Sequence, residues 1–155
     1  MNRRVFLASP IFCSVAFSKD EDEWAILESV QKHLFPKSKK YVGASQFEAT
    51  RYLKFVSKDG SFDESDLRFI FRGIKEIKSR GYKIDLAHAQ KEKILQEFAK
   101  ERFGENWIST VLNYTLEALF SDPIYGGNKN EIGWKSFNHN PGFPRPKKRF
   151  GAIDV

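Results

Sequence analysis

Side chains that could bind a metal ion or transfer a proton are few and scattered in this chain of 155 residues. The three histidines, His33, His88 and His139, lie in separate segments, and none has the short spacing of a zinc-binding pair. Glu117 and Asp122 are close in sequence, but neither a nucleophile nor a histidine accompanies them. We therefore expect no catalytic, cofactor-binding or metal-binding residue, and we interpret both carboxylates as capping or bridging groups.

The single cysteine, Cys13, restricts the redox chemistry of the chain. It lies in an apolar run over residues 5–17, which follows Arg3 and Arg4 and ends at an acidic cluster over residues 20–23. A cationic start, an apolar run and a polar boundary are the layout of an export signal. Because a membrane-spanning helix needs about 20 apolar residues, this run is too short for a normal anchor. Removal of the signal would leave no thiol for a disulfide, an iron–sulfur cluster or a thioether-linked haem.

The start of the chain also carries a more specific export pattern. Arg3 and Arg4, followed by Phe6 and Leu7, resemble the twin-arginine consensus. We predict a twin-arginine-type signal peptide over residues 1–18. The alternative is a first helix that stays in the protein, although the apolar run shows no helical stripe.

Five blocks of apolar residues have helical spacing, and the helices that they predict must position the candidate residues. No segment alternates between apolar and polar residues for long enough to predict a strand. The blocks run from Trp24 to Leu34, Phe47 to Val56, Leu67 to Ile77, Ile94 to Phe98 and Ile108 to Phe120. Ser45 and Glu48 have the spacing of a capping box, and we expect Asp85 and Asn106 to begin the fourth and fifth helices and Gly81 to follow the third. The prediction is an all-α fold, a compact bundle of about five helices followed by an irregular C-terminal segment rich in Gly, Pro and aromatic residues.

The 121–134 loop, SDPIYGGNKNEIGW, follows the last predicted helix. Its Asp-Pro pair ends that helix, and its Gly-Gly-Asn sequence can adopt positive φ without strain. Such a loop is built to hold one shape, so the rings of Tyr125 and Trp134 must pack against something. Two interpretations stay open, since these rings can plug the end of the bundle or bind a partner protein.

Residues 114–134, YTLEALFSDPIYGGNKNEIGW, closely resemble the signature of the gluconate 2-dehydrogenase subunit 3 family, the small or γ subunit. The matching positions are Phe120, Ser121, Asp122, Pro123, Tyr125, Gly126, Gly127, Asn128, Gly133 and Trp134. Tyr114 stands where the family usually has His, and Ala118 where it usually has Gly, so no role of that histidine is carried over. The resemblance implies that the matching residues form the family motif and contribute to partner binding.

The resemblance also implies a role for the whole chain. It would be the non-catalytic small subunit of a periplasmic, membrane-associated complex that oxidises gluconate or a related sugar or sugar acid. The expected partners are an FAD-dependent large subunit of the glucose-methanol-choline oxidoreductase type and, in many members, a cytochrome c subunit with haem c. The small subunit would hold no cofactor, and it would carry the signal that takes the folded flavoprotein through the twin-arginine translocase and stabilise that flavoprotein.

We therefore divide the chain into a signal peptide at 1–18, a helical small-subunit domain at 19–144 that includes the 121–134 loop, and a basic tail at 145–155. Two other functions stay open: a transient export chaperone that leaves the mature enzyme, and a basic helical protein that binds nucleic acid. The formal net charge of +6 is a modest bias, and the three cations at 147–149 bind phosphates weakly at physiological salt. We expect no nucleic-acid partner.

Overall fold

The computed structural model describes residues 14–149, with side chains from residue 21 onward, and this part of the chain is helical without any strand. The elements are α1 (Ser14–Leu34), α2 (Ala49–Val56), α3 (Glu64–Ser79), α4 (His88–Ala99), α5 (Arg102–Phe120), the 3-10 turns η1 (Pro123–Tyr125) and η2 (Lys129–Glu131), and α6 (Ile132–Phe137). The all-α prediction is confirmed, and α6 adds a short helix where we expected irregular structure. No helix in the described part has both the length and the apolar composition needed to cross a membrane.

The residues of the predicted export signal fall mostly outside this description. Arg3, Arg4, Phe6 and Leu7 lie outside the described residues, so the twin-arginine signal stays a prediction. The backbone of α1 begins at Ser14. Residues 14–18, the last five of the predicted signal, lie within this helix.

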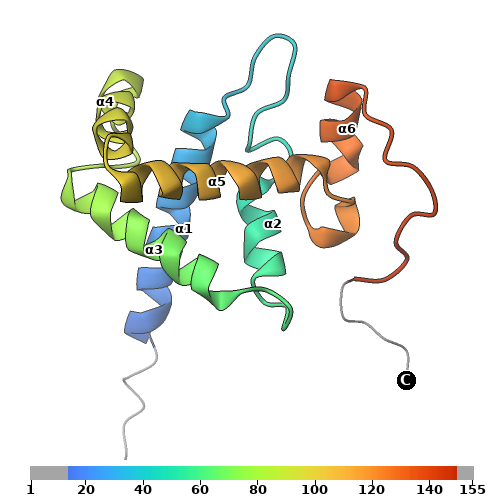
Figure 1. The fold of residues 1–155 in the computed structure, drawn as a ribbon, viewed down its shortest axis with the longest axis horizontal. Coiled ribbons are helices and arrows are strands. Elements are labelled where there is room, and N and C mark those ends of the chain that lie inside the picture. Colours follow the sequence, from blue (N-terminus) through green and yellow to red (C-terminus); the bar gives the residue numbers. More distant parts are fainter. Residues whose placement is uncertain (1–13, 150–155) are drawn as a thin grey trace, which may run out of the picture.

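Helix α5 organises the bundle. It runs across the middle of the molecule and contacts each of the other five α-helices (Figure 1). Trp107, Val111 and Thr115 recur every four residues and are all buried, which is the spacing of a core-facing helical stripe. Two core clusters form on α5, one around Trp107 and Val111 and a second around Ala118 and Leu119.

The main core lies between α1, α2, α3, α4 and α5. Its buried members are Ile26, Leu27, Val30, Leu53, Ile70, Ile74, Ile77, Tyr82, Leu95, Phe98, Trp107 and Val111. The largest of them, Trp107, is fully buried, and its indole N–H donates a hydrogen bond of 2.9 Å to the carbonyl of Ile70 on α3. Gly73 lies one turn further along α3, where the indole packs directly against the helix backbone. The α3–α5 contact therefore depends on a residue without a side chain.

A buried polar chain joins α1, α2 and α5. The amide of Gln31 donates to the Thr115 hydroxyl at 3.1 Å and accepts from the Thr50 hydroxyl at 2.6 Å. The Thr115 hydroxyl in turn donates to the carbonyl of Val111 at 2.7 Å. Every buried side-chain polar atom in the described region has a hydrogen-bond partner, so this polar chain costs little desolvation energy.

The predicted capping box before α2 is wrong. Helix α2 begins at Ala49, and Glu48 precedes it in the left-handed region at φ 60° without a side-chain capping bond. The Glu48 carboxylate instead pairs with Arg51 and Lys129. These cations come from the next turn and from η2, so a tertiary ion pair replaces the local cap.

Two predicted helix starts are also displaced. Helix α4 begins at His88 rather than Asp85, because the Gln90 side chain accepts a hydrogen bond of 3.1 Å from the amide of Ala87. Helix α5 begins at Arg102, four residues before Asn106, and includes Gly104. In contrast, Gly81 follows the α3 terminus at φ 89°, as predicted.

Gly73→Ala is expected to destabilise the protein by at least about 2 kcal/mol, because the new methyl group would overlap the Trp107 indole. This overlap outweighs the roughly 1 kcal/mol by which Ala favours a helix over Gly. The matched control is Gly60→Ala, since nothing lies within 4 Å of the added methyl group there. Urea unfolding of both variants checks the difference, and equal stabilities would contradict the packing described for Trp107.

Candidate functional site

The 121–134 loop folds back onto the C-terminal end of α5 through η1, η2 and the start of α6 (Figure 1). Its centre is Asn128, which is fully buried. The side-chain amide of Asn128 donates to the carbonyl of Ser121 at 2.9 Å and accepts from the amide of Gly133 at 2.8 Å. The backbone amide of Asn128 donates to the carbonyl of Phe47 at 2.8 Å. One residue thus joins the end of α5, the start of α6 and the segment before α2.

The glycines of the loop serve two separate purposes. Gly126 and Asn128 have positive φ values of 89° and 45°, as the sequence predicted. Gly127 and Gly133 do not, and they are required by space instead. A methyl group on Gly127 would lie 2.8 Å from the carbonyl of Ala118, and one on Gly133 would overlap the carbonyl of Leu119. The loop can lie directly on the backbone of α5 only because both side chains are absent.

Trp134 packs inward, which decides between the two interpretations for this ring. Its side chain is 4% exposed, and its indole N–H donates to the carbonyl of Phe120 at 2.8 Å. The guanidinium of Arg145 lies 4.4 Å from the centre of the Trp134 ring, and it donates to Asp122 at 2.6 Å and to Glu131 at 3.0 Å. The first residue of the predicted basic tail is therefore tied to the loop.

Asp122 has both predicted roles, since its carboxylate caps η1 and forms an ion pair with Arg145. Its carboxylate accepts from the amide of Ile124 at 3.1 Å and from Arg145. Burial raises the pKa of Asp122, but these hydrogen bonds and the Arg145 charge outweigh burial and hold the pKa below its usual value. Pro123 opens η1 with its fixed φ. The Ser121 hydroxyl donates to the carbonyl of Ala118.

Most of the motif residues make their contacts within the protein itself. Tyr125 is half-buried against the second core, which consists of Ala44, Phe47, Ala49, Tyr52, Ala118 and Leu119. Of the ten motif residues, Phe120 alone is exposed by more than a third, at 39%. A partner-binding role for the other nine stays a prediction. Phe120 is the one motif side chain that already faces outward.

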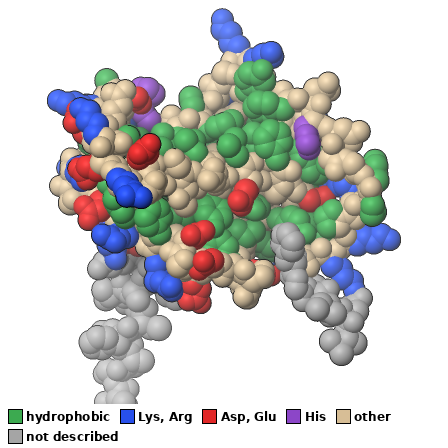
Figure 2. Space-filling model, viewed as in Figure 1, with side chains coloured by type: hydrophobic (Ala, Val, Ile, Leu, Met, Phe, Trp, Pro, Cys, Tyr) green, Lys and Arg blue, Asp and Glu red, His purple; other side chains and the backbone are tan. Residues whose placement is uncertain are grey.

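Phe120 belongs to an exposed aromatic patch, which we define as Tyr41, Leu116, Phe120 and Phe137. The rings of Tyr41 and Phe137 stack with their centres 4.6 Å apart, and the Phe120 ring meets Phe137 at 5.7 Å. Figure 2 shows hydrophobic side chains gathered on the face where α5 and the loop between α1 and α2 come into view. The sequence did not indicate Tyr41 or Phe137, because they lie 96 positions apart in a loop and a six-residue helix.

Positive charge adjoins the aromatic patch. Lys37, Lys39 and Lys40 are exposed on the loop between α1 and α2, and within the described residues none of them forms an ion pair. The ammonium of Lys40 lies 5.1 Å from the centre of the Tyr41 ring. In contrast, Lys135 on α6 has a partner in Glu131. The patch is thus an apolar surface with uncompensated positive charge at its rim.

The histidines are less scattered in space than in sequence. The rings of His33 and His88 have their centres 4.3 Å apart, and His33 Nε2 lies 2.6 Å from a carboxylate oxygen of Glu92. His139 lies elsewhere, beside Phe120. Across residues 14–149, no group of three or more His, Cys, Asp or Glu residues is arranged to hold a metal ion.

Asn128→Ala is expected to destabilise the protein by about 2–4 kcal/mol, because the carbonyl of Ser121 and the amide of Gly133 lose their buried partner. The control is Asn130→Ala, since Asn130 is exposed and also has a positive φ of 56°. Both variants place alanine at a positive φ, so the difference between them in urea unfolding reports mainly the contribution of the buried amide. Equal losses would show that Asn128 acts through its backbone conformation alone.

No curated protein and no solved structure matches the chain. The model of one protein family, described as gluconate 2-dehydrogenase subunit 3, matches residues 21–142. This match includes most of α1, all the other helices and the whole 121–134 loop. The chain therefore belongs to the gluconate 2-dehydrogenase subunit 3 family.

Proposed function

We propose that this protein is the non-catalytic small subunit of a periplasmic, membrane-associated dehydrogenase complex. Membership of the subunit 3 family implies a place in a multi-subunit dehydrogenase. The large subunit of that complex is an FAD-dependent flavoprotein of the glucose-methanol-choline type that oxidises gluconate or a related sugar acid. A cytochrome c subunit with haem c takes up the electrons, and this chain contributes binding and export without a cofactor of its own.

The observation that carries this proposal is the aromatic patch. Exposed aromatic clusters with a polar rim are typical of protein–protein interfaces, where aromatic side chains contribute most of the binding energy. The family motif builds the patch, because Phe120 belongs to the motif and Gly133 and Trp134 anchor the helix that carries Phe137. The unpaired lysines at the rim favour a partner surface that carries negative charge.

The loop that carries Tyr41 is held to α6 by a further hydrogen bond. The amide of Val42 donates to the Ser136 hydroxyl at 3.2 Å, next to the stack of Tyr41 on Phe137. Two segments from opposite ends of the domain therefore present one rigid surface. A pre-organised surface loses little side-chain entropy when a partner binds, which favours a stable complex.

Formation of this complex also accounts for export of the large subunit. The twin-arginine translocase moves folded proteins, so a small subunit that binds the folded flavoprotein takes it across the membrane on one signal. Arg3 and Arg4 supply that signal in this proposal. The large subunit then needs no signal of its own.

Substitution of Arg3→Lys together with Arg4→Lys is expected to abolish periplasmic delivery of the large subunit in co-expressing cells. Lysine keeps the charge but not the arginine pair that the translocase recognises, so the complex should accumulate in the cytoplasm. Fractionation with flavin fluorescence of the large subunit measures this, and Arg68→Lys, at an exposed position, is the control. Delivery of the large subunit without this chain would contradict the proposal. Equimolar recovery of both chains from the periplasm distinguishes a resident subunit from a transient chaperone.

Tyr41→Ser combined with Phe137→Ser is expected to weaken binding of the large subunit by about 2 kcal/mol or more, as for interface hot spots. Both side chains are more than a third exposed, so the fold should remain intact. Ile84→Ser is the matched control, since Ile84 is 48% exposed on the segment before α4 and outside the patch. Calorimetric titration gives the affinities, and equal affinity of the two variants would exclude the patch as the interface.

A further inference from the structure

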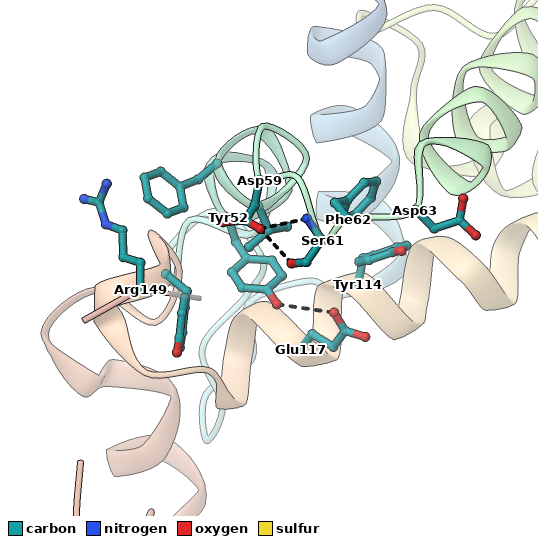
Figure 3. Close-up of a pocket in the computed structure, with 11 residues that line it drawn as sticks. Tyr52, Asp59, Ser61, Phe62, Asp63, Tyr114, Glu117 and Arg149 are labelled. Carbon is teal, nitrogen blue, oxygen red and sulfur yellow. Dashed lines mark hydrogen bonds between the residues drawn. The ribbon is translucent and has the colours of Figure 1, made fainter. Parts of the chain in front are cut away.

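A second feature lies along the exposed side of α5. A pocket with a volume of about 270 Å³ opens between α2, the turn at 59–63 and α5 (Figure 3). At 100° per residue along α5, Leu116 and Phe120 of the aromatic patch face one flank of this exposed side, whereas Tyr114 and Glu117 of the pocket face the other. The pocket is smaller than a typical small-molecule site, so its size suits a single side chain.

The walls of the pocket are aromatic. The rings come from α2, the 59–63 turn, α5 and η1, and they are those of Tyr52, Phe55, Phe62, Tyr114 and Tyr125. The faces of aromatic rings carry negative electrostatic potential and attract cations. Three tyrosines and two phenylalanines around one cavity therefore favour a positively charged occupant over an anionic one.

The polar groups of the pocket also favour a positively charged occupant. The Tyr52 hydroxyl donates to the Glu117 carboxylate at 3.3 Å, and the Tyr114 hydroxyl donates to Asp66 just behind the wall at 2.5 Å. Burial together with these carboxylates raises the pKa of Tyr52 and of Tyr114, so both phenols stay neutral. Burial, together with the nearby charge of Asp66, also raises the pKa of Glu117.

Two further acidic residues line the pocket, and of these the Asp63 carboxylate points away from the cavity and caps α3 (Figure 3). Asp59 accepts hydrogen bonds from the amide and the hydroxyl of Ser61, and Asp63 accepts one from the amide of Ser65. These bonds hold the pKa of both groups below the usual value, so both are ionised at neutral pH. The single cationic side chain among the lining residues is Arg149.

Arg149 places a cation against one wall of the pocket. Its guanidinium carbon lies 4.2 Å from the centre of the Phe55 ring, at the edge of the cavity (Figure 3). The C-terminal segment thus already lays a cation on one aromatic wall, while Glu117, which is exposed on α5 at the edge of the pocket, forms no ion pair within the described residues.

We propose that this pocket binds one guanidinium or ammonium side chain of the large subunit, and that Arg149 competes with it for Phe55. The identity of the partner rests on the proposed function, whereas the preference for a cation rests on the pocket alone. The cation would lie between the aromatic walls and form an ion pair with Glu117. Because the pocket and the aromatic patch flank the same exposed side of α5, one partner surface can reach both.

The preference for a cation is tested on the full chain with two probes of equal shape. N-acetyl-arginine methylamide carries a guanidinium, and the citrulline analogue carries a neutral urea in its place. We expect saturable shifts of the Tyr52, Tyr114 and Tyr125 ring resonances with the arginine probe, and at least about tenfold weaker binding of the citrulline probe. Equal binding of the two probes, or no saturable shift with either, would overturn the proposal.

Four variants then locate the bound cation. Glu117→Gln and Phe55→Leu, which remove the carboxylate and one ring face at nearly constant volume, should each weaken binding of the arginine probe by about threefold or more. Arg149→Ala should strengthen it, because the internal competitor is lost. Glu105→Gln is the matched control, since Glu105 is exposed on α5, does not line the pocket and forms no ion pair within the described residues. Unchanged binding in both pocket variants would overturn the assignment.

The same variants in the complex separate this inference from the proposed function. If the large subunit binds the native chain, Glu117→Gln should raise its dissociation constant by about tenfold. Unchanged affinity would overturn the inference and leave the proposed function intact. If the large subunit does not bind at all while the arginine probe does, the proposed function fails and the cation pocket stands.

Discussion

The buried amide of Asn128 is the interaction on which the C-terminal third of this protein depends. It joins the end of α5 to the start of α6, while the backbone of the same residue binds the segment before α2. Helix α6 has only six residues, far fewer than an isolated helix needs for stability in water. Its place, and with it the outward face of Phe137, therefore comes from this tertiary anchor. The loop needs a short polar residue with positive φ at Asn128 and no side chain at Gly127 and Gly133. These combined requirements explain why the family motif lies in this loop.

Helix α5 connects the stability of the bundle with the two proposed binding surfaces. One side of it carries the buried stripe of Trp107, Val111 and Thr115, and its exposed side has the aromatic patch on one flank and the cation-accepting pocket on the other. A rigid, centrally packed helix can present both features without reorganisation, which limits the entropic cost of binding. The inward packing of Trp134 and its stacking with Arg145 contribute by fixing the turn that follows this helix.

Local patterns predicted the helices well and their ends less well. Apolar spacing located five helices, because a stripe every three to four residues is dictated by the helix itself. The starts of α2 and α4 escaped prediction, since Glu48 is held by Lys129 from η2 and Gln90 replaces the expected cap at Asp85. At the candidate site, the sequence identified the motif and the positive φ of Gly126, but the close approach of Gly133 to Leu119 requires knowledge of how the loop lies on α5.

By itself, the sequence determined the all-α class, the family and the shape-holding character of the 121–134 loop, because each of these is written in residues that are near neighbours along the chain. Only the tertiary structure decided that Trp134 faces inward, that Tyr41 and Phe137 form one surface, and that aromatic walls from α2 and α5 enclose a pocket. Exposure depends on contacts between segments up to 96 residues apart, and no local pattern encodes which of two equally apolar rings the folded chain will cover.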